Sequence, residues 1–285
     1  MWRGLVRLGR VGSESFIGGN MKKKRLVAMG DYHCGHYSGL TPPSWDGPRQ
    51  EERYPNRYNA RRIVWDWYAE TLASLKPIDI LLVNGDLIDG SQEKSGGTEL
   101  LVTDPLEQID MAIDCIKQAN AKSVVLTFGT QYHTGIITDF EKVAADRLPN
   151  CAKIGGEDTY NINGWQINAR HHVGRSSIPH GRFTPVAREQ LGNMMWAARG
   201  EYPLADIILR SHVHYFVYCG GADPQPWLAV TLPALQSYGG KFGTRRMTGT
   251  VDIGMVCFDL PNKEKDTYTW QPILKRLPLH QSVSL

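Results

Sequence analysis

The chain has 285 residues, of which 41% are hydrophobic and 21% charged, and its formal net charge is +3 at pH 7. This composition is typical of a globular protein that can bury a sizeable core. The small positive charge is no argument for a nucleic-acid partner by itself. No stretch reaches the ~18 consecutive apolar residues of a membrane span, so we expect no membrane partner.

Cysteine usage and the start of the chain add two expectations. The 5 cysteines form no CxxC pair and leave an odd number, which favours reduced thiols in a cytoplasmic protein over a disulfide framework. Residues 1–20 show no sustained periodicity and end in GGN before Met21. We therefore expect residues 1–20 to be a disordered leader and residues 21–285 to form a single domain.

Strands and helices alternate in the first half of the chain. Short apolar runs predict strands, and apolar residues at helical spacing predict the helices between them. Asp104 followed by proline marks the start of one of these helices. The expected strands are 25–30, 78–84 and 123–128, and the expected helices are 58–75, 105–119 and 138–148.

The second half of the chain is richer in strands. Residues 159–163 and 165–170 flank Gly164 and predict a hairpin, and a helix over 184–199 leads to a strand over 206–210. Four later apolar segments predict further strands: VHYFVYC, PWLAVTL, DIGMVCFDL and DTYTWQPIL. Helix–strand alternation followed by strands predicts an α/β domain in which two sheets pack together with helices outside.

Acidic and histidine residues gather at the ends of the predicted strands. Residues i and i+2 of an extended chain point to the same face, so the members of a DxH or HxH pair can converge on one point. An apolar strand end is also where open α/β sheets place a ligand crevice. The segments are DYH at 31–33, GDLID at 85–89, GTQYH at 129–133, HH at 171–172 and HVH at 212–214.

Each of these short patterns is common on its own, but their joint occurrence at strand ends predicts a metal site. Mixed imidazole and carboxylate ligands suit Mn, Fe, Zn or Ni rather than Ca or Mg, which prefer oxygen.

In this order the motifs DYH, GDLID, the GTQYH position, HH and SHVH resemble those of the calcineurin-like metallophosphoesterases, over about residues 30–260. The segments HCGHYSGLTPP, HHVG and RSHVH resemble phage or prophage members in particular. The resemblance implies a four-layer α/β/β/α sandwich of two mixed sheets. It also implies two divalent transition-metal ions at the strand ends, with Mn²⁺ the first candidate and Fe, Zn or Ni the others.

The resemblance also implies a role for each motif residue. Asp31, His33 and His214 would bind the first ion, and Asp86 would bridge both ions. The second ion would be bound by His212 and by His171, or by His172 in place of His171. We favour His171, because adjacent residues in an extended chain face opposite ways, which makes its neighbour a supporting residue.

One motif departs from the family pattern. Where the family has Gly-Asn-His, this chain has Thr130 and Gln131 after Gly129, and His133 comes two positions late. One interpretation keeps His133 as the catalytic acid, with Thr130, Gln131 or water in place of the asparagine. The other makes His133 itself a metal ligand.

The predicted activity is hydrolysis of phosphate esters by a hydroxide that two metal ions activate, with no covalent intermediate. Basic residues favour phosphodiesters, with nucleic acid and nucleotides as candidate substrates and nuclease activity as one form of the reaction. The substrate-binding candidates are Arg175, Arg182, Tyr238, Lys241 and Arg245. A phosphomonoesterase acting on nucleotides or phosphoproteins is the alternative enzyme, and a non-catalytic scaffold that kept the fold is the alternative of another class.

Overall fold

The computed structural model describes residues 22–47, 55–135, 138–222, 226–239 and 251–277. The expected leader and the substrate candidates Lys241 and Arg245 lie outside this part of the chain.

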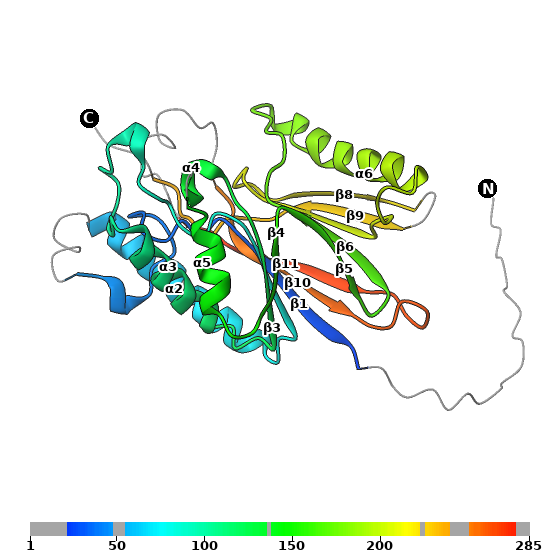
Figure 1. Cartoon of the computed structure of the whole chain (residues 1–285), viewed down its shortest axis with the longest axis horizontal. Coiled ribbons are helices and arrows are strands. Elements are labelled where there is room, and N and C mark those ends of the chain that lie inside the picture. Colours follow the sequence, from blue (N-terminus) through cyan, green and yellow to red (C-terminus); the bar gives the residue numbers. More distant parts are fainter. Residues whose placement is uncertain (1–21, 48–54, 136–137, 223–225, 240–250, 278–285) are drawn as a thin grey trace, which may run out of the picture.

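The strands belong to two mixed sheets (Figure 1). The first sheet has the order β11-β10-β1-β2-β3-β4, with parallel pairing from β1 to β4 and antiparallel pairing of β10 with β1 and β11. Its strands are β1 (Lys24–Met29), β2 (Ile80–Asn84), β3 (Ser123–Thr127), β4 (Cys151–Gly155), β10 (Ile253–Leu260) and β11 (Thr269–Lys275).

The second sheet has the order β5-β6-β7-β9-β8, and its central strands β6, β7 and β9 run parallel. The two outer pairs, β5 with β6 and β8 with β9, are antiparallel. The strands are β5 (Glu157–Ile162), β6 (Trp165–Arg170), β7 (Ile207–Arg210), β8 (Val217–Gly221) and β9 (Trp227–Thr231).

Helices cover the outer face of each sheet. Four helices follow strands of the first sheet or precede them: α2 (Pro55–Leu75), α3 (Pro105–Lys117), α4 (Gln131–Thr134) and α5 (Phe140–Arg147). Helix α6 (Phe183–Ala198) lies on the second sheet, against β7, β8 and β9 (Figure 1). Short 3₁₀ turns lie at Pro43–Trp45, Glu93–Ser95 and Pro179–Gly181.

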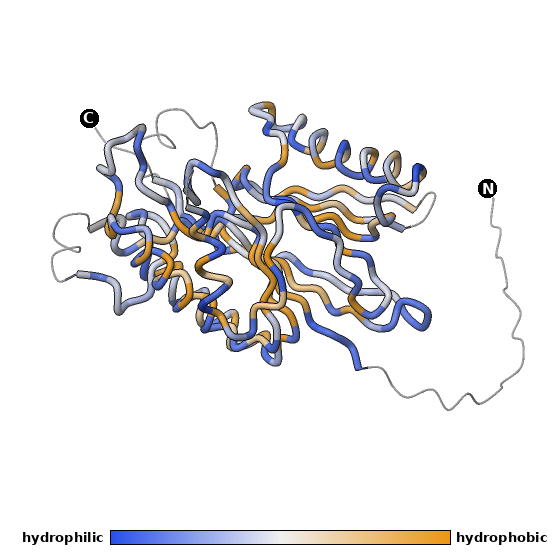
Figure 2. Tube along the Cα trace, in the orientation of Figure 1, coloured by the Kyte–Doolittle hydropathy of each residue, from blue (hydrophilic) through white to orange (hydrophobic). Residues whose placement is uncertain are grey.

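The side-chain alternation of β1 shows how the layers form. Val27 and Met29 pack with the helices on the outer face of the first sheet, whereas Leu26 and Ala28 face the second sheet. Successive strand residues point to opposite faces, so a strand covered on both faces is hydrophobic throughout. Figure 2 shows this hydrophobic character along the central strands. The expected four-layer α/β/β/α arrangement of two mixed sheets is confirmed.

Several expected elements needed correction. Strand β4 and the short helix α4 were not expected from the sequence. It also began a strand at Val213, but β8 starts at Val217 because His212 and His214 have left-handed backbone conformations that break the extended chain. None of the helices in the described ranges has both the length and the hydrophobicity needed to cross a bilayer.

We predict that the layer between the sheets carries much of the stability. Leu209 is fully buried there, so Leu209→Ala should lower the free energy of unfolding by about 2–5 kcal/mol, measured by urea denaturation. Leu191 of α6 is 58% exposed, and Leu191→Ala should change that free energy by no more than about 0.5 kcal/mol. Equal losses in the two variants would contradict the assigned core.

Candidate metal centre

The predicted site residues come together at one end of the sandwich, where the carboxyl ends of parallel strands from both sheets meet. Asp31 follows β1 and Asp86 follows β2 in the first sheet, while His171 follows β6 and His212 follows β7 in the second. Parallel strands present their carboxyl ends at the same edge, which is the usual place for a ligand crevice in α/β folds. The topology therefore brings together residues that are far apart in the sequence.

The backbone at these positions is unusual. Of the 8 non-glycine residues with positive φ in the described part of the chain, 5 belong to the cluster. Side chains with a Cβ adopt this conformation at an energetic cost, and such strain concentrates at functional sites. The five residues and their φ angles are Asp31 (52°), His33 (46°), Asp86 (53°), His212 (73°) and His214 (55°).

Asp31, His33 and His214 form the first group of candidate ligands. The Nε2 atom of His214 lies 3.3 Å from Asp31 Oδ1 and 3.3 Å from His33 Nε2. The other ring nitrogen of His33, Nδ1, lies 2.9 Å from Asp89 Oδ1. This contact fixes the ring and leaves Nε2 directed at the group, which is the usual arrangement behind a metal-binding histidine.

Asp86, His171 and His212 form the second group. His171 Nε2 lies 3.2 Å from Asp86 Oδ2, and its Nδ1 lies 2.7 Å from the carbonyl oxygen of Asn84. The hydroxyl of Thr130 lies 3.3 Å from His171 Nε2 and 3.2 Å from His212 Nδ1. The Thr130 side chain thus supplies an oxygen at the point where the second group converges.

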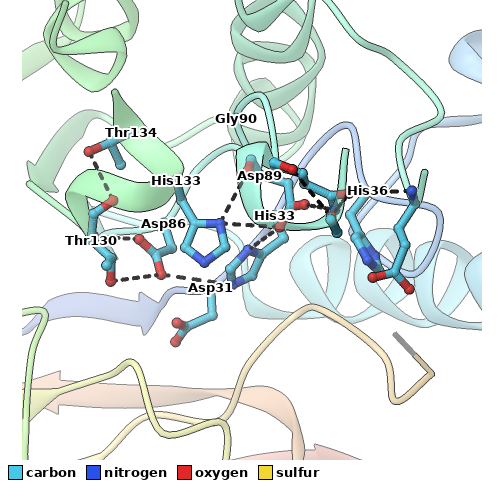
Figure 3. A network of polar contacts seen from close by, with 12 residues as sticks. Asp31, His33, His36, Asp86, Asp89, Gly90, Thr130, His133 and Thr134 are labelled. Carbon is cyan, nitrogen blue, oxygen red and sulfur yellow. Dashed lines mark hydrogen bonds and ion pairs between the residues drawn. The ribbon is translucent and has the colours of Figure 1, made fainter. Parts of the chain in front are cut away.

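The two groups are joined through Asp86. His33 Nε2 lies 3.8 Å from Asp86 Oδ2, and His33, Asp86 and His133 make a third set of mutually close ligand atoms. Within each of the three sets the ligand atoms all lie within 4.8 Å of one another. The cluster is therefore continuous, and Asp86 belongs to two of its three sets. Figure 3 shows the part of it that contains Asp31, His33, Asp86 and His133.

His133 is held by Asp89 despite its shifted position in the motif. Its Nδ1 lies 3.3 Å from Asp89 Oδ1 and 3.2 Å from the carbonyl oxygen of Asp89. Figure 3 shows Asp89 connected to the rings of both His33 and His133. The short helix α4, which starts after Thr130, provides the turn that carries His133 back to the cluster.

Other predicted candidates lie at the edge of the cluster or away from it. His172 is exposed, and its ring packs against His212 at a centroid distance of 4.6 Å. Gln131 is also exposed, whereas His171 is buried. The structure thus brings His171 rather than His172, and Thr130 rather than Gln131, into the cluster.

The buried carboxylates of the cluster are ionised. Burial acts to raise the pKa of Asp86, but the charge and hydrogen bond of His171 outweigh it and hold that pKa far below its usual range. Burial also opposes ionisation of Asp31, and His214 outweighs it, so the pKa of Asp31 is lowered. A carboxylate must be ionised to bind a metal ion, and these two carboxylates meet that requirement.

The donor set fits metal ions. Imidazole and carboxylate side chains are the ligands that transition metals share in proteins. Two of the histidines also have one ring nitrogen fixed by a hydrogen bond, which selects the nitrogen left for a metal. Such a pattern is costly to bury without a cation, and it supports the expectation of a metal centre here.

Three of the substrate-binding candidates, Arg175, Arg182 and Tyr238, lie in the described part of the chain. Arg175 is exposed, and the Arg182 guanidinium lies 4.6 Å from the ring centroid of Tyr215, the residue after His214. Tyr238 is half-buried in the segment that contacts the loop after Asp31. Arg170, the residue before His171, is paired with Glu157 and Glu189.

The sequence analysis did not assign roles to Asp89 or Glu141. The spacing of the GDLID motif was the available signal for Asp89. Glu141 lies 12 residues after Gly129 within a helix, and no pattern distinguishes it from a surface glutamate. In the structure it is fully buried and accepts hydrogen bonds from Leu87 N (3.1 Å) and Gly129 N (2.6 Å).

Gly129 is required by close packing against Asp86. A Cβ atom at position 129 would collide with the carboxylate and the backbone nitrogen of Asp86, whereas one at Gly156 would have no atom within 4 Å. We predict that Gly129→Ala displaces Asp86 and weakens Mn²⁺ binding at least tenfold in titration calorimetry, while Gly156→Ala binds like the wild type. Unchanged affinity in Gly129→Ala would contradict the placement of Asp86 in the metal centre.

Comparison with known proteins identifies no family for this chain. No family model and no curated protein matches it. Among solved structures, it is similar to an archaeal phosphodiesterase at 14% identity and a TM-score of 0.41, covering 87% of this chain and 99% of the other. It is also similar to Vps29 of Entamoeba histolytica complexed with zinc, at 11% identity and a TM-score of 0.39, covering 88% and 98%. Likenesses this low give no information about the activity of the chain.

Proposed function

We propose that this protein is a metal-dependent phosphoesterase with a dinuclear metal centre. The observation that carries the proposal is the continuous, buried set of histidines and aspartates around Asp86. Asp31, His33 and His214 are the proposed ligands of one ion. His171, His212 and the Thr130 hydroxyl are those of the other, with Asp86 bridging both.

Bound at these ligands, two divalent ions would supply the positive charge that lowers the pKa of water and offsets the charge of a phosphate ester. The chain's own part is to orient the ester and to protonate the leaving oxygen. Arg175, Arg182 and Tyr238 are the proposed contacts of the ester, and Lys241 and Arg245 stay predictions from the sequence.

His133 is the proposed proton donor. Asp89 holds its Nδ1 atom, so Nε2 is the nitrogen that can deliver a proton to the leaving group. Burial lowers the pKa of His133, but the hydrogen bond to Asp89 and the charge of Asp86 raise it to about 9. A histidine with this pKa is protonated at neutral pH, as a general acid must be. The alternative role, as a metal ligand, is supported by the proximity of His133 to His33 and Asp86.

Phosphodiesters are the proposed substrates, with nucleic acid or nucleotides as the biological candidates. The support is the basic side chain of Arg182, whose guanidinium lies over the ring of Tyr215, the residue after His214. Manganese as the metal, nuclease activity and phage or prophage origin stay predictions from the sequence. The scaffold alternative rested on the missing asparagine, and the position of the Thr130 hydroxyl weakens that argument.

The substrate class can be tested with two model esters. We expect the protein with saturating Mn²⁺ to hydrolyse bis-p-nitrophenyl phosphate faster than p-nitrophenyl phosphate, and Asp86→Ala to abolish both activities. A clear preference for the monoester would replace the diesterase proposal by the monoesterase one. If fewer than one ion binds per chain and neither ester is hydrolysed, the scaffold alternative is favoured.

The acid role of His133 can be tested by the pH dependence of turnover. Protonated His133 is the active form, so kcat should fall as the pH rises through its pKa. Asp89→Asn removes the negative charge that raises this pKa and should move the alkaline limb of kcat, measured at saturating Mn²⁺, to lower pH by about 1–3 units. His133→Asn should lower kcat by about 10²–10⁴-fold. If His133→Asn instead loses a bound ion, the residue is a ligand and not the acid.

A further inference from the structure

Glu141 is a buried carboxylate next to the metal centre. It lies in α5, is fully buried, and has its neighbour Ala144 in the hydrophobic cluster beneath the first sheet. None of the ion pairs among the described residues involves Glu141. Burial and the charge of Asp86 raise the pKa of Glu141 to about 8, and its hydrogen bonds to the backbone oppose that rise.

The hydrogen bonds of Glu141 connect two loops of the site. Its Oε1 atom accepts a hydrogen bond from the backbone nitrogen of Leu87, the residue after Asp86. Its Oε2 atom accepts one from the backbone nitrogen of Gly129, the residue before Thr130. The pairing of β2 with β3 ends at Asn84 and Thr127, so no strand ladder joins the chains at these points. Glu141 satisfies two buried N–H groups that the ladder leaves unpaired.

The position of Asp86 depends on the same contact between loops. The backbone nitrogen of Thr130 donates to Asp86 Oδ1 at 2.6 Å, and the Thr130 hydroxyl lies 3.4 Å from Asp86 Oδ2. Figure 3 shows these two contacts side by side. A change in the distance between the loops would therefore move the carboxylate of Asp86 and the hydroxyl of Thr130 relative to each other.

We propose that Glu141 is a positioning residue that holds Asp86 and Thr130 at the spacing the metal centre needs. The inference rests on the proposed function only in requiring that the cluster binds metal. Glu141 does not touch the ligand atoms, and it acts through the backbone of the residues next to Asp86 and Thr130. A carboxyl group suits this role because it has two oxygens, one for each N–H group.

Glu141→Gln is the informative change. The amide keeps the shape of the side chain but offers a single oxygen, so its NH₂ group must face the N–H of Leu87 or Gly129. Changes to groups that orient metal ligands typically weaken metal binding by about 10–100-fold. We expect a loss of this size in Mn²⁺ affinity for Glu141→Gln, measured by titration calorimetry on protein that is folded before metal is added.

Asp206 provides a control at the opposite end of the sandwich. It is also buried and accepts a hydrogen bond from the backbone nitrogen of Gln166 at 2.9 Å, and it is paired with Lys263 at 2.6 Å. It precedes β7, whereas His212 follows that strand. We expect Asp206→Asn to lower the melting temperature without changing Mn²⁺ affinity. Wild-type affinity in Glu141→Gln, or the same loss in both variants, would overturn the positioning role.

A second variant and a second readout keep the test decisive. If Glu141→Gln does not fold, Glu141→Asp is the second variant. It keeps the carboxyl group but is too short to reach both N–H groups, and it should also lose affinity relative to Asp206→Asn. The absorption spectrum with Co²⁺ should change in the Glu141 variants because the ligand geometry changes. Wild-type affinity and spectrum in Glu141→Asp would overturn the proposal.

Neither of these two measurements requires hydrolysis. A wild-type protein that binds metal but has no esterase activity would therefore refute the proposed function, while the test of the Glu141 role would still apply.

Discussion

Asp86 lies where the two sheets meet, and its carboxylate contacts both halves of the site. It is close to His33 from the first sheet and to His171 from the second. A buried carboxylate is stable in its ionised form only if positive charge or hydrogen bonds surround it. Three features position this carboxylate. They are the order of the parallel strands, the left-handed backbone conformations at the strand ends, and the close packing of Gly129 against Asp86.

The sequence was sufficient to predict the fold class and the members of the cluster, because both depend on local signals. Short apolar runs ending in Asp or His residues indicate where strands stop, and parallel strands bring those ends to one edge. The expectation that the DxH and HxH pairs converge because they lie in extended backbone was wrong. Asp31 with His33 and His212 with His214 do not lie in extended chain, because each of the four has a positive φ.

Two features of the site depend on contacts that no local pattern encodes: the path that brings the predicted His133 to the cluster, and the role of Glu141, which was missed. The return of His133 to the cluster requires the α4 turn and the contact with Asp89, which is distant in the sequence. Glu141 is a helical glutamate whose burial follows from how α5 packs against the first sheet. His171 is buried and His172 is exposed, in line with the expectation that adjacent residues of an extended chain face opposite ways.

The proposed hydrolysis requires that the cluster around Asp86 binds metal ions. The most direct test is anomalous diffraction from crystals of the protein grown with Mn²⁺. The account predicts two anomalous peaks about 3.5–4 Å apart on either side of the Asp86 carboxylate. Crystals that show no peak among these side chains at saturating Mn²⁺ would contradict it.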